Sequence, residues 1–211
     1  MPLEELPHYV NDVISIKKKT KIRVKLGLEV DFIPDDMSAF NILKHYAFDY
    51  FIGSVHFIGE WGFDQDDYVS EFGRMGVDKA YIKYCELIGR MADTCLFDIV
   101  GHLDLPKKFG HFPGKKVLPH FDRALRFVKS ANMAVEINTS GLDRKAKEMY
   151  PSPDILKLCY QHDIPLTLGS DSHKPGEVGR HFAEAKALLR KVGYHSLVSF
   201  TNHRHTKFRI S

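Results

Sequence analysis

The chain has 211 residues, of which 44% are hydrophobic and 27% are charged, and its formal net charge at pH 7 is +3. This balance suffices for one well-buried domain and excludes the compositions of a disordered chain or of a strongly basic nucleic-acid-binding protein. The longest apolar runs are far shorter than a membrane span, and the first residues lack the pattern of a secretory signal, so we expect a cytoplasmic protein without a membrane partner.

Helical and strand-like segments alternate along the chain. Apolar spacing predicts helices over residues 3–18, 39–44, 78–92, 118–128, 153–161 and 182–192, with Ser38 as the cap of the second helix. Apolar runs predict strands over 22–28, 50–55, 97–101, 133–137, 165–169 and 197–200. Because this reading contains no strand hairpin, the order predicts a parallel α/β sheet, either open or closed into a barrel. The cysteines Cys85, Cys95 and Cys159 are odd in number and lie in apolar stretches, which is typical of buried, reduced thiols.

Two loops between these elements carry unusual residues. Trp61 is the single tryptophan and lies in a loop bounded by glycines. It can form a wall over a pocket or belong to a satellite hydrophobic cluster, and the sequence favours neither. Residues 103–114 form a long basic loop bounded by glycine and proline, and loops of this length in a compact domain are usually functional.

The strand over residues 165–169 leads directly to Asp171 and His173. Carboxylate oxygens and imidazole nitrogens are ligands for Zn, Mn or Fe, although one such pair is a weak signal. Three further strands end in residues of the same kind, namely Glu29, His56 and His102. Any single histidine of this set is more simply explained as a surface residue. Because the carboxyl ends of parallel strands meet on one face, however, several together predict a shared metal site.

Five ordered motifs resemble those of the PHP (polymerase and histidinol phosphatase) superfamily, and the resemblance extends over essentially the whole chain. They are Gly-Leu-Glu-Val-Asp at 27–31, Gly-Ser-Val-His at 53–56, Gly-His-Leu-Asp at 101–104, Glu-Ile-Asn-Thr-Ser-Gly at 136–141 and Gly-Ser-Asp-Ser-His at 169–173. The spacing and the Asn-Thr-Ser-Gly segment are most similar to the monofunctional histidinol-phosphatase branch.

The resemblance implies a distorted (β/α)7 TIM-like barrel that holds two or three divalent metal ions. It implies that Glu29 is a bridging carboxylate and that His56 and His102 share a metal with it. Asp171 would bind a neighbouring metal and His173 a third.

Members of the family begin with a strand that ends in His-x-His, and the segment before Glu29 in this sequence has no such motif. We therefore expect residues 1–211 to be a single PHP-type domain that lacks its first βα units at the N-terminus. Missing strands would expose neighbouring strand edges and so favour self-association. They would also weaken metal binding and slow turnover.

The function implied by the resemblance is hydrolysis of L-histidinol phosphate to L-histidinol and phosphate in histidine biosynthesis. Asp171 or Glu29 would orient the nucleophile, and a basic side chain would clamp the phosphate. Arg144, which follows the Asn138 segment, is the first candidate for the clamp, ahead of Lys174 and Arg180. Trp61 and the loop that carries His111 would hold the imidazole end of the substrate, and Asn138 would also contact the substrate. Two alternatives remain, a PHP-type phosphoesterase for another small phosphate and a non-catalytic remnant that depends on a partner.

Overall fold

A five-stranded parallel sheet forms the centre of the protein, which is described by a computed structural model over residues 1–210. The strands lie in the order β1-β2-β5-β6-β7. Their bounds are Gly27–Asp31 for β1, Tyr50–Ser54 for β2, Ile99–Val100 for β5, Ala134–Asn138 for β6 and Leu166–Gly169 for β7. Because all neighbours in this sheet are parallel, their carboxyl ends lie along the same edge.

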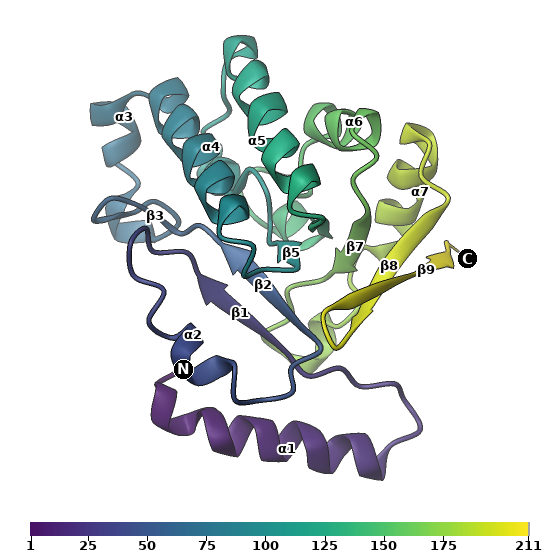
Figure 1. Ribbon diagram of the computed structural model, residues 1–211. Helices are drawn as coiled ribbons and strands as arrows, with labels where there is room; N and C mark the ends of the chain where they lie inside the picture. Colours follow the sequence, from purple (N-terminus) through teal and green to yellow (C-terminus); the bar gives the residue numbers. More distant parts are fainter. Residues whose placement is uncertain (211) are drawn as a thin grey trace.

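Helices cover this sheet from outside, as expected for crossover connections. Figure 1 shows a row of helices on one side of the sheet, with α1 apart from this row and below β1. The row consists of α4 (Val77–Asp93), α5 (Leu118–Ser130), α6 (Pro153–Gln161) and α7 (Phe182–Val192), whereas α1 spans Leu6–Lys19. Two short helices, α2 (Phe40–Leu43) and α3 (Glu71–Met75), lie in the connections. Short 3-10 turns cover Leu3–Glu5, Asp66–Tyr68, Leu105–Phe109, Lys115–Val117, Ser140–Asp143 and Pro175–Glu177.

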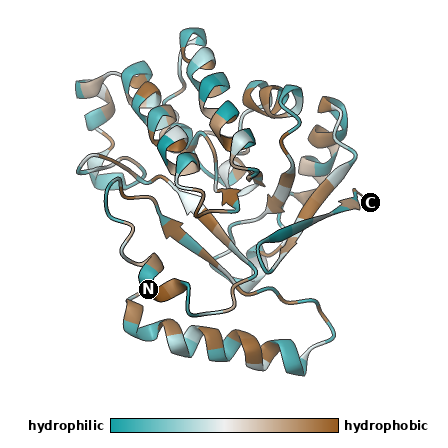
Figure 2. Ribbon diagram, viewed as in Figure 1, coloured by the Kyte–Doolittle hydropathy of each residue, from teal (hydrophilic) through white to brown (hydrophobic). Residues whose placement is uncertain are grey.

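The hydrophobic core lies between the sheet and the helix row. All five residues of β6 are buried, because this strand has a neighbour on each side and is covered on both faces. In α4, Tyr81, Ile88 and Ala92 are fully buried, which follows the apolar stripe seen in the sequence. Figure 2 shows the same pattern, with hydrophobic strands in the interior and hydrophilic outer faces on the helices.

Two antiparallel hairpins contradict the expectation that the chain contains none. β3 (Phe57–Ile58) pairs with β4 (Trp61–Gly62), and β8 (Ser196–Thr201) pairs with β9 (Arg204–Arg209). In the second hairpin, Asn202 and His203 both have positive φ, which is the conformation that a tight two-residue turn requires. β9 escaped sequence-based recognition because its residues are mostly charged and exposed.

Other expectations need smaller corrections. The first strand was expected over 22–28 but runs from Gly27 to Asp31, because its ladder starts where Gly27 meets Tyr50 of β2. Ser38 does not cap a helix; its hydroxyl donates to Asp36 Oδ1 at 2.7 Å. Cys95 is exposed, whereas Cys85 and Cys159 are buried. The helices over 153–161 and 182–192 are confirmed to the residue.

The α/β class and the parallel order are therefore confirmed. Within residues 1–210 the hydrogen bonding of the central sheet ends at β1 on one side and β7 on the other, and β8 packs beside β7. No helix in the same range is long and apolar enough to cross a membrane.

Candidate metal centre

A cavity of about 610 Å³ opens at the carboxyl edge of the sheet. It collects the five residues that the sequence suggested as metal ligands and the arginine that it suggested for phosphate. Its lining comprises Met1, Leu3, Leu6, Leu28, Glu29, Val30, Asp31, Ala39, Leu43, His56, Asp64, His102, Leu105, Lys108, Ser140, Arg144, Asp171 and His173. The structure thus brings these candidate side chains together at one rim of the fold.

Three of these side chains meet closely enough to bind one ion. Glu29 Oε1 lies 3.0 Å from His102 Nε2, and His56 Nε2 lies 3.2 Å from His102 Nε2. One ligand atom from each residue falls within 4.8 Å of the other two. A carboxylate oxygen and two imidazole nitrogens that converge in this way fit a divalent transition metal.

Residues on β1 and β2 orient this group. Asp31 Oδ1 lies 2.5 Å from His56 Nδ1, which leaves the other ring nitrogen facing Glu29 and His102. Ser54 donates its hydroxyl to Glu29 Oε1 at 2.6 Å. Because Glu29 and Asp31 are two residues apart on a strand, they point to the same face of the sheet. A carboxylate behind a ligating imidazole is a common second layer of metal sites.

Glu136 on β6 fixes the position of His102. Its buried carboxylate accepts hydrogen bonds from the backbone N–H of His102 and from Asn138 Nδ2, both at 3.0 Å. Gly169 on β7 packs against this carboxylate, and a Cβ at Gly169 would lie 1.9 Å from Glu136 Oε1. The glycine therefore makes room for the support of a candidate ligand.

The charges of the group are mutually stabilising. Burial on its own would raise the pKa of Glu29, but hydrogen bonds from His102 and Ser54 and the nearby imidazoles lower it to about 2. Burial would lower the pKa of His102, but its hydrogen bond to Glu29 and the charge of that carboxylate raise it above the ordinary value.

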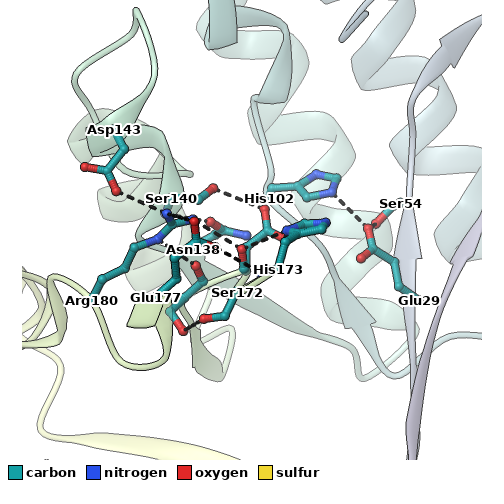
Figure 3. Close-up of polar contacts among 12 residues, drawn as sticks. Glu29, Ser54, His102, Asn138, Ser140, Asp143, Ser172, His173, Glu177 and Arg180 are labelled. Atoms are coloured by element: carbon teal, nitrogen blue, oxygen red, sulfur yellow. Dashed lines mark hydrogen bonds and ion pairs between the residues drawn. The ribbon is translucent and has the colours of Figure 1, made fainter. Parts of the chain in front are cut away.

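Asp171 and His173 line the same cavity as Glu29, His56 and His102. Asp171 Oδ2 accepts a hydrogen bond from Ser140 Oγ at 3.1 Å. His173 has a side chain that is 78% exposed, and its Nδ1 lies 3.2 Å from the carbonyl oxygen of Asp171. Figure 3 shows His102 reaching towards Glu29 from a polar network that includes Ser140, His173 and Arg180.

Four residues suggested for substrate binding lie outside the cavity lining. Arg180 donates to the carbonyl oxygens of Ser170 and Asp171 and so braces the loop that carries Asp171. Asn138 is buried and bonded to Glu136. Lys174 is exposed at a turn. Trp61 packs edge-on against Phe63 and Phe72, which corresponds to the hydrophobic cluster and not to the pocket wall.

Arg144, in contrast, lines the cavity, and its guanidinium has no hydrogen bond or ion pair within residues 1–210. Sequence reasoning did not single out Asp31, Ser54, Glu136, Asp64 or Lys108. Asp31 could have been found from its two-residue spacing to Glu29, because alternate residues of a strand share a face. The contacts of the others join distant segments and leave no local signal in the sequence.

Comparisons with known proteins agree with this geometry. Residues 1–140 match the PHP domain family model. A probable histidinol-phosphatase of Deinococcus radiodurans is 40% identical over 196 residues, an alignment that covers 92% of this chain and 75% of the relative. The chain belongs to the PHP domain family.

Solved structures show the same fold. The crystal structure that bears the name putative histidinol phosphatase HisK, from Listeria monocytogenes, superimposes with a TM-score of 0.79 at 26% identity, over 87% of this chain and 77% of that one. The histidinol phosphate phosphatase of Lactococcus lactis, solved with Zn, L-histidinol and phosphate, superimposes with a TM-score of 0.78 at 24% identity. The latter match covers 95% of this chain and 79% of that one.

Proposed function

We propose that this chain is a metal-dependent phosphomonoesterase that hydrolyses L-histidinol phosphate to L-histidinol and phosphate. The convergence of Glu29, His56 and His102 in a cavity that also contains Arg144 is the observation that carries the reaction class. The substrate is supported by the histidinol-phosphatase names of the relatives and by the ligands of the Lactococcus lactis structure.

Glu29, His56 and His102 would hold one divalent ion, and Asp171 and His173 would extend the site to two or three ions of Zn, Mn or Fe. Such ions lower the pKa of a bound water to about 7 and neutralise the phosphoryl oxygens. The donor set favours a borderline metal over Mg or Ca, because it includes two imidazoles.

The side chains of the chain have separate tasks in this reaction. Arg144 binds the phosphate through charge-assisted hydrogen bonds, for which its free guanidinium is suited. Glu29 or Asp171 orients the attacking water, because each presents a carboxylate to the cavity. The apolar residues Leu3, Leu28 and Leu43 form another part of the lining and can shield the reaction from bulk water.

The test is phosphate release from L-histidinol phosphate by the purified chain loaded with Zn, Mn or Fe. We expect turnover that a chelator abolishes and that added metal restores. Faster hydrolysis of another small phosphate in a substrate panel would mean that the chain is a phosphoesterase for that substrate. A chain that binds no metal and releases no phosphate would instead be a non-catalytic remnant or a partner-dependent subunit.

A further inference from the structure

The cavity contains one carboxylate that the metal centre does not use. Four acidic residues line it, and three have a partner at the centre. Glu29 belongs to the donor group, Asp31 holds His56, and Asp171 is bonded to Ser140. The fourth, Asp64, follows strand β4 and lies outside the donor group.

Lys108 holds Asp64 through its backbone carbonyl and one of its two carboxylate oxygens. The Lys108 ammonium donates to the backbone carbonyl of Asp64 at 2.6 Å and, with a longer hydrogen bond of 3.3 Å, to the carboxylate Oδ2. Within residues 1–210, Oδ1 of Asp64 has no hydrogen-bond partner. Each of the two side chains lines the cavity and is 21% exposed, so the Asp64 carboxylate is partly shielded from water.

The segment that holds Lys108 adjoins the segment that holds Arg144. The backbone N–H of Ala146, two residues after Arg144, donates to the carbonyl oxygen of Lys108 at 3.3 Å. The cavity therefore places a free cation and a partly free anion on neighbouring segments. A ligand with a negative group for Arg144 and a positive group for Asp64 would satisfy both.

We propose that Asp64 is a specificity-determining residue that binds a protonated amine on the substrate, so that the cavity selects phosphate monoesters that carry a primary ammonium group. This proposal rests on the phosphatase function proposed above. The Asp64 carboxylate accepts charge-assisted hydrogen bonds from the ammonium group. Lys108 is a positioning residue, because it fixes the loop that presents this carboxylate.

The test compares L-histidinol phosphate with the analogue that lacks the amine, 3-(imidazol-4-yl)propyl phosphate, in the metal-loaded chain. We expect Asp64→Asn to lower kcat/KM for L-histidinol phosphate by about 10- to 100-fold, mainly through KM, since a hydrogen bond to a charged group is lost. The same change should leave the analogue nearly unaffected. Asp66→Asn is the matched control, because Asp66 is exposed in the same region and outside the cavity lining.

Equal losses on both substrates, or no loss on either, would overturn the proposal while leaving the phosphatase function intact. If the wild-type chain hydrolyses neither substrate, the phosphatase function fails, and Asp64 is tested by calorimetric binding of L-histidinol. Weaker binding to Asp64→Asn than to the wild type and to Asp66→Asn would then support the amine site. Unchanged or undetectable binding would exclude it.

Discussion

His102 Nε2 lies 3.0 Å from Glu29 Oε1, although the two residues are 73 positions apart in the chain. Glu29 belongs to the edge strand β1, and His102 follows β5, two strands away in the sheet. Parallel pairing through β2 brings the two together and adds His56, which follows the strand between them. The order of strands β1, β2 and β5 in the sheet therefore brings the three side chains of the candidate metal centre together.

Loss of the carboxylate should weaken metal binding. We expect Glu29→Gln to reduce Zn affinity by at least about 100-fold, because changes even to second-layer partners of metal ligands cost roughly 10- to 100-fold. Competition with a chromogenic chelator measures this. Glu60→Gln, an exposed change outside the cavity, is the control. Equal Zn affinities for the two variants would remove Glu29 from the metal centre.

Metal binding should also depend on pH. The pKa of His102 is raised in the metal-free protein, so this imidazole must release a proton before it can bind an ion. The pKa of Glu29 is about 2, so the carboxylate stays ionised at all working pH values. We expect Zn affinity to fall as pH falls through the raised pKa of His102, with proton release visible by calorimetry in buffers of different ionisation enthalpy. An affinity that is constant from pH 6 to 8 would contradict this assignment.

Two basic residues near the site should behave differently. Arg144→Ala should lower kcat/KM for a phosphate monoester by about 10- to 100-fold, because a charge-assisted contact to phosphate is lost. Lys174→Ala should retain nearly full activity, because Lys174 is exposed and does not line the cavity. Steady-state kinetics of both variants with the same substrate decides. A larger loss of kcat/KM in Lys174→Ala than in Arg144→Ala would mean that Lys174 binds the phosphate.

A buried lysine supports the loop after β5. Lys107 has a side chain that is 1% exposed, and its ammonium contacts Asp104 at 2.9 Å and Glu148 at 2.7 Å. We expect Lys107→Met to lower the free energy of unfolding by about 3–5 kcal/mol, because it leaves buried negative charge without compensation. Urea denaturation measures this, with Lys116→Met as the control, since that lysine is exposed. A loss below about 1 kcal/mol would mean that the pair is not buried in solution.

The same variant has an expected pH dependence. Burial raises the pKa of Asp104 to about 6, even though Lys107 acts to lower it. The folded state therefore binds this proton more tightly than the unfolded state, and the stability contributed by protonation is lost as pH rises through about 6. Removal of Lys107 strengthens the effect, so the loss of stability should be larger at pH 8 than at pH 5. Equal losses of unfolding free energy at pH 5 and pH 8 would contradict the raised pKa of Asp104.

Gly169 offers a test of the support for His102. Gly169→Ala places a methyl group against Glu136, and the carboxylate must move away from the backbone N–H of His102. We expect weaker Zn binding with the helices intact by circular dichroism. Gly73→Ala is the control, because its Cβ would meet open space. Unchanged Zn binding in Gly169→Ala would show that Glu136 does not position His102.

Local patterns in the sequence were sufficient for the helices and most strands. The helix over 153–161 has proline in its first turn, and the apolar stripe over 182–192 is regular, so both were bounded correctly. The start of β1 was misplaced because strand ends are set by the pairing partner, here Tyr50, and not by the apolar run. The β8–β9 hairpin depends on two positive-φ residues that carry no glycine signal.

Some residues of the candidate site could be predicted from the sequence, and others could not. Side chains directly after strands, such as His56 and His102, were recognisable because their position relative to the strand fixes their face. Arg180 and Trp61 lie outside the cavity lining, because each is engaged by contacts with other segments that the sequence pattern does not reveal. Asp64 and Lys108 became visible only as a pair, because their significance lies in the distance between them.

The most direct test is an anomalous difference map from a crystal of this chain soaked in Zn. We expect a Zn peak within bonding distance of Glu29, His56 and His102, with any second peak near Asp171 and His173. Zn bound elsewhere in the molecule, with these three side chains free of metal, would contradict it.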